Sequence, residues 1–267
     1  VADMRLNAVL TFYFPEIFTW YMRQFHRVFS WLARTSSTKI IAISEATKKD
    51  LVSHYAVASE KIAVVPHGYT NTENINHQLP DDLKAKLPEK YVMFLSTLQP
   101  RKNLELLIDA FRELKTEHPE LPHKLVVVGK PGWKFHSILR KVDENKDIVI
   151  YLGHVGDNDR WPIYRGADLF VCPSLYEGFG MPLLEAFEGN TPVAISNNSS
   201  LPEVGGDAAL YFDPTSKQEM KAAMFKILSD ENLRNEMIAK GKMQLAKFSW
   251  DRCARETLAV LEQVGKK

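Results

Sequence analysis

The sequence predicts an α/β fold, in which a parallel sheet is covered by helices on both of its faces. Two observations support this class. From residue 91 onward, short apolar runs alternate with stretches of helical character, which is the pattern of parallel strands joined by crossover helices. One of these runs leads through a turn with two glycines into an apolar helix, an arrangement that open α/β sheets use at ligand sites.

The apolar pattern places the individual elements. Short runs rich in β-branched or aromatic residues predict strands, and longer stretches with one apolar face predict helices. The expected strands are residues 91–96, 124–129, 148–152, 168–172, 191–196 and 208–212. The expected helices are residues 104–115, about 159–166, 182–189, 217–229, 231–246 and 250–264. This alternation predicts a Rossmann-like domain with a parallel sheet at residues 89–245.

The part of the chain before this domain has a weaker pattern. We expect a strand at residues 39–44, a helix at residues 44–55 and a second strand at residues 61–65, with Ser44 as the N-cap of the helix. Residues 70–88 are polar and contain two prolines, so we interpret them as a linker.

Composition excludes several classes of protein. The apolar content of 45% and the charged content of 25% are ordinary for a globular protein. The net charge of +1, without a strongly basic block, gives no support for a nucleic-acid partner. Cys172 and Cys253 form no pattern and are interpreted as reduced thiols. No apolar run approaches the ~20 residues of a membrane span. We therefore expect a cytoplasmic protein.

Aromatic residues gather near the N-terminus, with nine of them between residues 12 and 31. Tyr21, Phe25 and Phe29 share one helical face, with basic residues between them. One interpretation is a helix packed on the core of a domain. The other is an interfacial helix, peripheral at a membrane surface or contacting a lipid-linked acceptor. The segment 12–34 is also the candidate surface for a partner chain or for a homo-oligomer.

The stretch from Pro173 to Phe187 carries the strongest functional signal. It has the sequence Pro-Ser-Leu-Tyr-Glu-Gly-Phe-Gly-Met-Pro-Leu-Leu-Glu-Ala-Phe and joins a buried strand to an apolar helix. Gly178 and Gly180 free the turn and allow a ligand to approach the backbone. Pro182 suits the first helical position, where its missing N–H costs nothing.

Polar groups in the same turn suit an anion or a sugar. The backbone N–H groups of Phe179, Gly180 and Met181 are expected to point out of the helix N-terminus, where they can bind a phosphate or a sugar oxygen. Glu177 precedes the turn, and Glu185 lies one turn inside the helix. Both carboxylates can therefore reach one cleft at the carboxyl end of a strand.

The whole stretch resembles the Glu-x7-Glu signature of the retaining glycosyltransferases of family 4 (glycosyl transferases group 1), which have the GT-B fold. The resemblance implies that Glu177 and the loop Gly178–Met181 hold the donor sugar and its diphosphate. It implies that Glu185 holds the ribose hydroxyls. It also implies a front-face mechanism, in which the departing phosphate oxygen helps to deprotonate the acceptor.

A second stretch, Ser-Thr-Leu-Gln-Pro-Arg-Lys-Asn, lies between the first strand of the domain and a helix that Asn103 is expected to cap. Taken alone, Arg101 and Lys102 fit a solvated turn with two exposed cations. In this context the string resembles the family's Arg-Lys-Asn motif, which implies that both cations hold the leaving nucleoside diphosphate as part of the catalytic site. The family often has glycine where Ser96 stands, so Ser96 is expected to narrow the site.

Two shorter segments complete the expected donor site. Gly129 and Lys130 end a strand, and Gly129 lets the nucleotide base lie over the backbone. Val155 closes the string Gly153-His154-Val155, which resembles the family segment whose backbone meets the edge of the base. His154 is also compatible with a simple turn residue.

The string Asp157-Asn158-Asp159 looks like the Asp-x-Asp metal site of the other large glycosyltransferase fold. It lacks the strand end that such a site needs, and it lies where an N-cap is expected before Arg160. We therefore expect no metal and no cofactor, with two cations in place of a metal's charge.

The resemblance implies a retaining hexosyltransferase with a nucleotide-sugar donor, such as GDP-mannose or another NDP-hexose, and a hydroxyl acceptor on a saccharide or a lipid-linked sugar. The wording of residues 40–68 looks closest to bacterial mannosyl- and rhamnosyltransferases of surface polysaccharide or glycolipid synthesis. One alternative is a non-catalytic nucleotide-sugar-binding subunit that needs a separate acceptor-domain chain. Another, a Rossmann-fold epimerase or dehydrogenase, needs a Gly-x-Gly-x-x-Gly that the first strand does not lead to.

The resemblance also divides the chain. Residues 1–69 correspond to the remnant of an N-terminal acceptor-binding domain, and a linker follows at residues 70–88. Residues 89–245 correspond to the nucleotide-sugar-binding domain, and residues 246–267 to a C-terminal helix that crosses back to the first domain. The first part has about half the size of a typical domain of ~150 residues. We therefore expect a truncated form or one half of a split enzyme.

Overall fold

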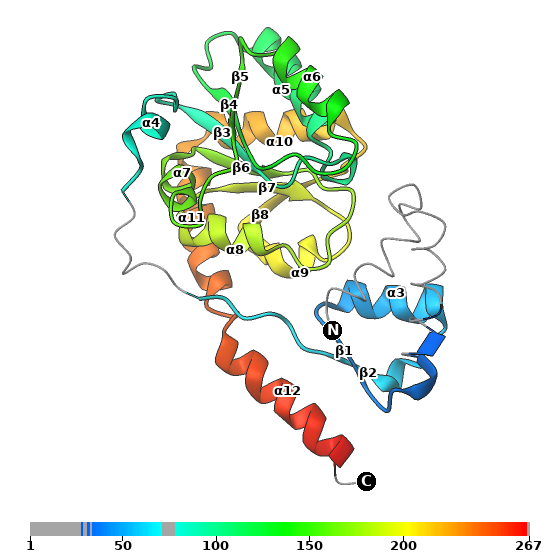
Figure 1. The fold of residues 1–267 in the computed structure, drawn as a ribbon. Coiled ribbons are helices and arrows are strands. Elements are labelled where there is room, and N and C mark those ends of the chain that lie inside the picture. The colour runs from blue at the N-terminus through cyan, green and yellow to red at the C-terminus, as the bar shows by residue number, and fades with distance from the viewer. Residues whose placement is uncertain (1–27, 29–30, 33, 71–77, 266–267) are drawn as a thin grey trace. The chain divides into compact units, whose positions relative to one another are not determined.

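The computed structural model describes residues 28, 31–32, 34–70 and 78–265 (Figure 1). The prediction for the aromatic segment 12–34 therefore falls largely outside the described residues. The chain forms two compact units. The first contains residues 1–70, 177–179 and 248–267, and the second contains residues 71–176 and 180–247.

The second unit is built on a six-stranded parallel sheet with the strand order β5-β4-β3-β6-β7-β8. The strands are β3 (Tyr91–Leu95), β4 (Lys124–Val128), β5 (Val149–Gly153), β6 (Leu169–Cys172), β7 (Val193–Ser196) and β8 (Ala209–Phe212). Val92 of β3 pairs with Leu125 on one side and with Leu169 on the other. The predicted α/β class is confirmed.

Helices cover both faces of this sheet (Figure 1). One face carries α5 (Leu104–Glu117), α6 (His136–Glu144) and α10 (Lys217–Ser229). The other carries α7 (Arg160–Gly166), α8 (Met181–Glu188), α9 (Leu201–Gly205) and α11 (Glu231–Leu245). The strands and helices that the sequence predicts begin and end within two residues of those observed.

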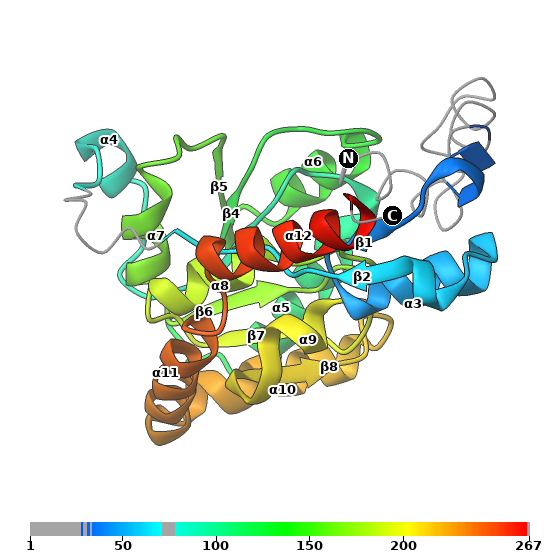
Figure 2. The same cartoon turned by 90° about the horizontal axis from the view of Figure 1, so that it is seen from below.

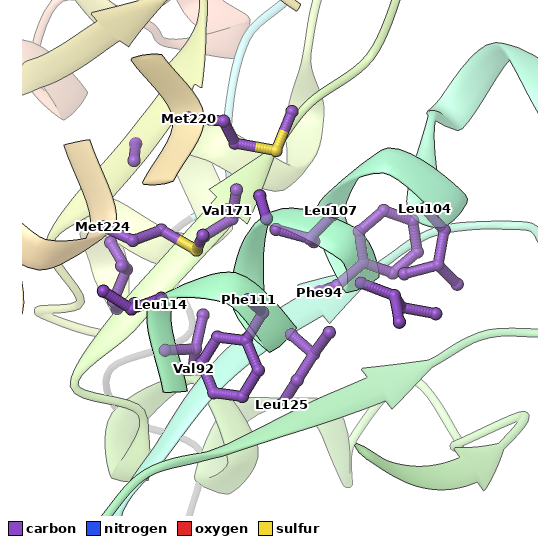
Figure 3. Packing of buried hydrophobic residues seen from close by; sticks show 14 of the residues in the cluster. Val92, Phe94, Leu104, Leu107, Phe111, Leu114, Leu125, Val171, Met220 and Met224 are labelled. Carbon is purple, nitrogen blue, oxygen red and sulfur yellow. The ribbon is translucent and has the colours of Figure 1, made fainter. Parts of the chain in front are cut away.

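One hydrophobic core cluster of the second unit lies between the sheet and the helices α5 and α10 (Figure 3). Leu107, Phe111 and Leu114 follow one stripe of α5 and are fully buried, as the helical period requires of a core-facing face. They meet Val92 from the sheet and Met224 from α10. Burial of this stripe fixes α5, and with it the turn that precedes α5, against the strand ends.

The first unit has a smaller core. Its strands β1 (Ile40–Ala42) and β2 (Ile62–Val64) pair in parallel, and α3 (Glu45–Tyr55) and the 3₁₀ turn η2 (Ser59–Lys61) connect them. The predicted N-cap is confirmed, because the Ser44 hydroxyl accepts a hydrogen bond from the N–H of Thr47 at 3.1 Å.

The last helix, α12 (Trp250–Gly265), also belongs to the first unit and runs without interruption (Figure 2). Its start is tied to the chain after β2, because the indole N–H of Trp250 donates to Thr70 Oγ1 at 3.0 Å. A Cβ at Gly68 would lie 2.2 Å from the backbone nitrogen of Trp250, so only glycine allows this approach. No helix in the described part of the chain is long and apolar enough to cross a membrane.

Within the described part of the chain, the sequence-based prediction misses the helices α4 (Asp81–Lys84), α6 and α9. The helix α4 has a single turn and lies within the segment that we interpret as a linker. Its residues are mostly polar, so no apolar pattern indicates a helix there. In α6 only Ile138 and Val142 are buried, and α9 spans five residues and contains Pro202. The helices α4 and α9 are too short to show an apolar period, whereas α6 places Ile138 and Val142 on one face at i, i+4 spacing, a signal that the sequence analysis missed.

Candidate active site

The predicted site residues follow the carboxyl ends of β3 and β6, which are neighbours at the centre of the sheet. The strand order reverses between them, with β4 and β5 beyond one and β7 and β8 beyond the other. Open α/β sheets bind their ligands outside the carboxyl ends of the strands at such a reversal. The topology therefore supports a ligand site where the sequence motifs place it.

The turn after β3 contacts the loop after β6. The turn contains the 3₁₀ segment η3 (Pro100–Lys102). The N–H of Leu175 donates to the carbonyl of Arg101 at 2.9 Å, and the guanidinium of Arg101 donates to the carbonyl of Tyr176. Arg101 is 8% exposed and Lys102 is 9% exposed. The alternative of a solvated turn with two exposed cations is therefore wrong.

Asn103 has a role that differs from the predicted cap. It precedes α5 with a φ of 59°, and its side chain makes no capping hydrogen bond to the helix. The side-chain amide instead donates to the carbonyls of Pro173 at 3.0 Å and Pro214 at 2.8 Å. Asn103 thus joins the loops that follow β3, β6 and β8.

The turn into α8 requires a glycine at position 180. Gly180 has a φ of 108°, in the left-handed region. The helix begins at Met181, so Pro182 is its second residue and not the predicted first one. The missing N–H still costs nothing there, since the first turn has no acceptor for it. Two of the expected donor-binding residues, Gly180 and Met181, thus lie at the start of one helix.

Residues 177–179 make their described contacts within the first unit. The carbonyl of Gly178 accepts a hydrogen bond from the Ser44 hydroxyl at 2.9 Å. The ring of Phe179 lies edge-on to His67, with the centroids 5.3 Å apart, and edge-on to Phe248 at 5.7 Å. Glu177 directly precedes Gly178 and is half-buried.

Glu185 is held through both of its carboxylate oxygens. Its Oε1 lies 3.2 Å from the guanidinium Nη2 of Arg160, and its Oε2 accepts from the Tyr164 hydroxyl at 3.0 Å. Burial raises the pKa of the Glu185 carboxyl above its ordinary value, against the lowering effect of the Arg160 charge. The sequence analysis names neither partner as a site residue. They share a face at i, i+4 spacing, but no local pattern shows that this face meets α8.

The predicted base-binding segments end β4 and β5. Gly129 has a φ of 148°, and a Cβ there would lie 1.7 Å from the carbonyl oxygen of Ser96. The neighbouring backbone therefore requires this glycine, whatever else it contacts. Its N–H donates to the carbonyl of Gly153 at 2.8 Å, which links the two segments. Lys130 is exposed and Val155 is buried.

The string Asp157-Asn158-Asp159 does not cap α7 through a side chain. The side chain of Asp159 makes no capping hydrogen bond, and its backbone is already helical, so this part of the prediction is wrong. Asp157 instead pairs with Arg160 inside the same turn, with Oδ1 and Nη1 3.1 Å apart. Among the described residues, no group of three or more His, Cys, Asp or Glu side chains could hold a metal ion. Independence from metal remains a prediction.

The fold and the placement of charges define an α/β protein with a candidate anion site at the switch point of its sheet. Comparison with known proteins makes the assignment specific. The family model described as "Glycosyl transferases group 1" matches residues 76–244, and that described as "Glycosyltransferase Family 4" matches residues 2–72. The chain belongs to the glycosyl transferases group 1 family, as the sequence motifs imply.

Curated relatives and solved structures agree with this family. The chain is 37% identical over 229 residues to the O-antigen chain mannosyltransferase B of Escherichia coli, covering 84% of this chain and 60% of that relative. A glycosyltransferase from Rickettsia africae has a TM-score of 0.76 at 17% identity, covering 90% of this chain and 68% of that one. Anabaena HepE, solved with UDP and glucose, has a TM-score of 0.75 at 18% identity, covering 99% and 76%. The predicted GT-B fold is confirmed.

Proposed function

We propose that this chain binds a nucleotide-diphospho-sugar at the carboxyl ends of β3 and β6 and belongs to a retaining hexosyltransferase. The observation that carries the proposal is the contact between the two motifs. The buried cation Arg101 holds Tyr176, which directly precedes Glu177 of the Glu-x7-Glu stretch. The cationic motif and the carboxylate motif therefore meet at one place in the sheet, although 75 residues of chain separate Arg101 from Tyr176.

Arg101 and Lys102 supply the positive charge in this proposal. A nucleoside diphosphate gains negative charge as the bond to the sugar breaks, and cations that are already in place stabilise that charge without reorganisation. Both side chains are buried, and the attraction between charges is stronger there than in bulk water. The bidentate fork of Arg101 suits phosphate oxygens, and Lys102 acts as a point charge.

The turn into α8 supplies the remaining groups around the sugar. The N–H groups of residues 179–181 and the positive end of the helix dipole bind phosphate or sugar oxygens. Glu177 orients the sugar and balances the positive charge that develops on it. The oxygen of the acceptor hydroxyl attacks the anomeric carbon from the face on which the phosphate departs, so the anomeric configuration is retained. The departing phosphate oxygen takes the proton of that hydroxyl.

The nucleoside is held by Glu185 of α8 and by the segments that follow β4 and β5. Glu185 accepts hydrogen bonds from the ribose hydroxyls, while Gly129, Lys130 and Val155 line the base. The carbonyl of Ser96 lies close to Gly129 and would do so with any residue at position 96, so narrowing of this end by the Ser96 side chain remains a prediction.

The names of the relatives support a mannose donor, with GDP-mannose as the first candidate. The 37% identical relative is named a mannosyltransferase of the O-antigen chain, which supports a saccharide or lipid-linked acceptor in surface polysaccharide synthesis. The chain spans 60% of that relative's length. The donor sugar, the acceptor, and transfer by this chain alone are therefore all part of the proposal.

Titration calorimetry of the purified chain tests the binding step. We expect GDP, UDP or ADP to bind, and the matching nucleoside to bind far more weakly, because most of the contacts go to the diphosphate. If none of the three diphosphates and neither GDP-mannose nor UDP-glucose binds, the proposal is overturned. Transfer is tested with GDP-mannose and α-mannobiose, for which proton NMR should show a new α-linked product and not a β-linked one.

A further inference from the structure

The carboxylate of Glu185 is held on both of its oxygens by one neighbouring helix. Oε1 lies 3.2 Å from Arg160 Nη2, and Oε2 accepts from the hydroxyl of Tyr164 at 3.0 Å. Arg160 and Tyr164 stand one turn apart on α7, which packs against α8. Only 10% of the Glu185 side chain is exposed. A buried carboxylate in such a clamp has few directions left in which it can act.

The hydroxyl of Tyr164 is fixed in place and remains a donor. Tyr164 is fully buried, and its ring lies edge-on to Phe170 with the centroids 5.4 Å apart. Its carbonyl accepts from the Thr191 hydroxyl at 2.6 Å, which anchors the backbone as well. Burial and the neighbouring Glu185 charge raise the pKa of the Tyr164 hydroxyl well above its ordinary value. The group therefore keeps its proton and donates a hydrogen bond to Oε2.

The guanidinium of Arg160 is held on three sides. It pairs with Glu185 on one side and with Asp157 at 3.1 Å on another, and its centre lies 5.2 Å from the ring centroid of Trp161. Its Nε is buried and has no hydrogen-bond partner within the described part of the chain. These contacts restrict the guanidinium and favour the position in which it pairs with Oε1.

We propose that Arg160 and Tyr164 are positioning residues that aim the Glu185 carboxylate at the ribose of the donor. A carboxylate has about four acceptor directions, two on each oxygen. Arg160 occupies one direction on Oε1, and Tyr164 occupies one on Oε2. One direction on each oxygen is then left for the two neighbouring hydroxyls of a ribose. This inference rests on the proposed function, because it needs a nucleotide at the site.

A purely structural tie between α7 and α8 makes a different prediction. Loss of such a tie would lower the stability of the protein and weaken every ligand of the site alike. Loss of a positioning pair instead weakens ligands that carry both ribose hydroxyls more than ligands that carry one. The ratio of affinities for GDP and 2′-deoxy-GDP, or for UDP and 2′-deoxy-UDP, separates the two.

The experiment compares the wild-type chain with Tyr164→Phe and Arg160→Met, and uses Glu113→Gln as a matched control at a different helix pair. Tyr164→Phe removes one oxygen and keeps the ring, and Arg160→Met keeps much of the apolar stem. Calorimetry should show that both variants bind the ribonucleotide about tenfold more weakly, as expected for a hydrogen bond to a charged group. In both variants the ratio of the affinity for the ribonucleotide to the affinity for the deoxynucleotide should fall toward one. Glu113→Gln should keep the wild-type ratio.

The outcomes distinguish this inference from the proposal on which it rests. If the wild-type chain binds none of the four nucleotides, and neither ADP, GDP-mannose nor UDP-glucose, the proposed function fails. If the wild-type chain binds and prefers the ribonucleotide, and folded variants keep the wild-type ratio, the positioning role alone is overturned. If one variant unfolds before it can be titrated, the other variant decides, because each variant removes one of the two contacts to the Glu185 carboxylate.

Discussion

Two glutamates in this protein are held between helices by cations, yet they respond to that contact in opposite ways. Glu113 on α5 accepts from Lys221 at 2.6 Å and Gln218 at 2.8 Å, and pairs with Lys217 at 2.6 Å. Glu185 on α8 is held by Arg160 and Tyr164 of α7. The contacts of Glu113 lower the pKa of its carboxyl to about 2, whereas the pKa of Glu185 is raised.

The difference comes from solvent. Water reaches the cluster around Glu113, so its charge is hydrated and the lysines only add to its stability. Glu185 lies in the interior, where the cost of desolvation exceeds the benefit of one arginine. A carboxylate kept there at such a cost is a candidate functional group, while the surface one is a helix tie. A carboxylate that is held by a cation of a neighbouring helix thus indicates different roles at the two places.

The largest expected effect separates the two carboxylates of the motif. Glu177→Gln should largely spare nucleoside-diphosphate affinity but remove sugar transfer by the complete enzyme, because Glu177 acts on the sugar. Glu185→Ala should weaken the nucleotide itself, because it acts on the ribose. Calorimetry with GDP or UDP and a radiolabelled-donor assay measure the two effects. Interchanged results would show that the two carboxylates are wrongly placed.

The cations of the turn after β3 give the next effect. Arg101→Ala and Lys102→Ala should each weaken nucleoside-diphosphate binding by about tenfold or more, since a hydrogen bond to a charged group contributes roughly 1.5–3 kcal/mol. Binding of the bare nucleoside should change far less. Because Arg101 also holds the carbonyl of Tyr176, thermal melts must accompany the titrations. Equal losses for both ligands in folded variants would rule out the phosphate role.

A pH series sharpens the comparison directly. Glu185 has a raised folded-state pKa, so it takes up a proton at a higher pH than an ordinary glutamate, whose pKa is 4.5, and nucleotide affinity should fall from that higher pH downward. Asp157 and Glu188 raise this pKa further, while Arg160 and Tyr164 oppose them. Arg160→Met should move the fall in affinity to still higher pH. A midpoint that does not move in that variant contradicts the assignment.

Glu113 should show the reverse dependence in the same series. Its folded-state pKa is lowered, so its contribution to the free energy of unfolding is present above the ordinary value of 4.5 and is lost as the pH falls toward about 2. Near the ordinary value, nucleotide binding should already be weakened while the tie between α5 and α10 remains. Melting curves of the wild-type chain and Glu113→Gln, compared between pH 4.5 and about pH 2, measure how much Glu113 contributes to stability at each pH.

The smallest expected effect is that of chelation. Because buried cations take the place of a metal's charge in the proposal, EDTA should leave donor binding and turnover unchanged, and added Mg²⁺ or Mn²⁺ should not raise them. Binding that EDTA abolishes and a divalent ion restores would overturn this prediction. It would also show that Arg101 and Lys102 are not sufficient to neutralise the diphosphate.

Much of the fold could be predicted from the sequence, because apolar periodicity is a local property. The strands of the six-stranded sheet follow from it, and the N-cap at Ser44 follows from the preference of serine for that position. Features that depend on distant neighbours could not be predicted in the same way. Asn103 looks like a cap but bonds to Pro173 and Pro214, and Gly129 is required by the carbonyl of Ser96. Residue type indicates what these groups can bind, and only the packing shows which partner is present.

The candidate site divides along the same line. The Glu-x7-Glu and Arg-Lys-Asn strings are local patterns, and they locate the switch point of the sheet. The clamp on Glu185 joins two helices, and nothing in the local sequence around Arg160 indicates that its side chain meets α8. Tyr164 likewise resembles an ordinary core aromatic until its hydroxyl is found beside a carboxylate.

The most direct test is a titration of the wild-type chain, Glu185→Gln and Glu113→Gln with GDP and UDP under one set of conditions. Both substitutions replace a carboxylate that is held between two helices by a cation, so each controls for the other. The account predicts that one of the diphosphates binds the wild-type chain, that Glu113→Gln binds it equally well, and that Glu185→Gln binds it about tenfold more weakly or worse. Equal affinity of a folded Glu185→Gln variant and the wild-type chain would contradict the account.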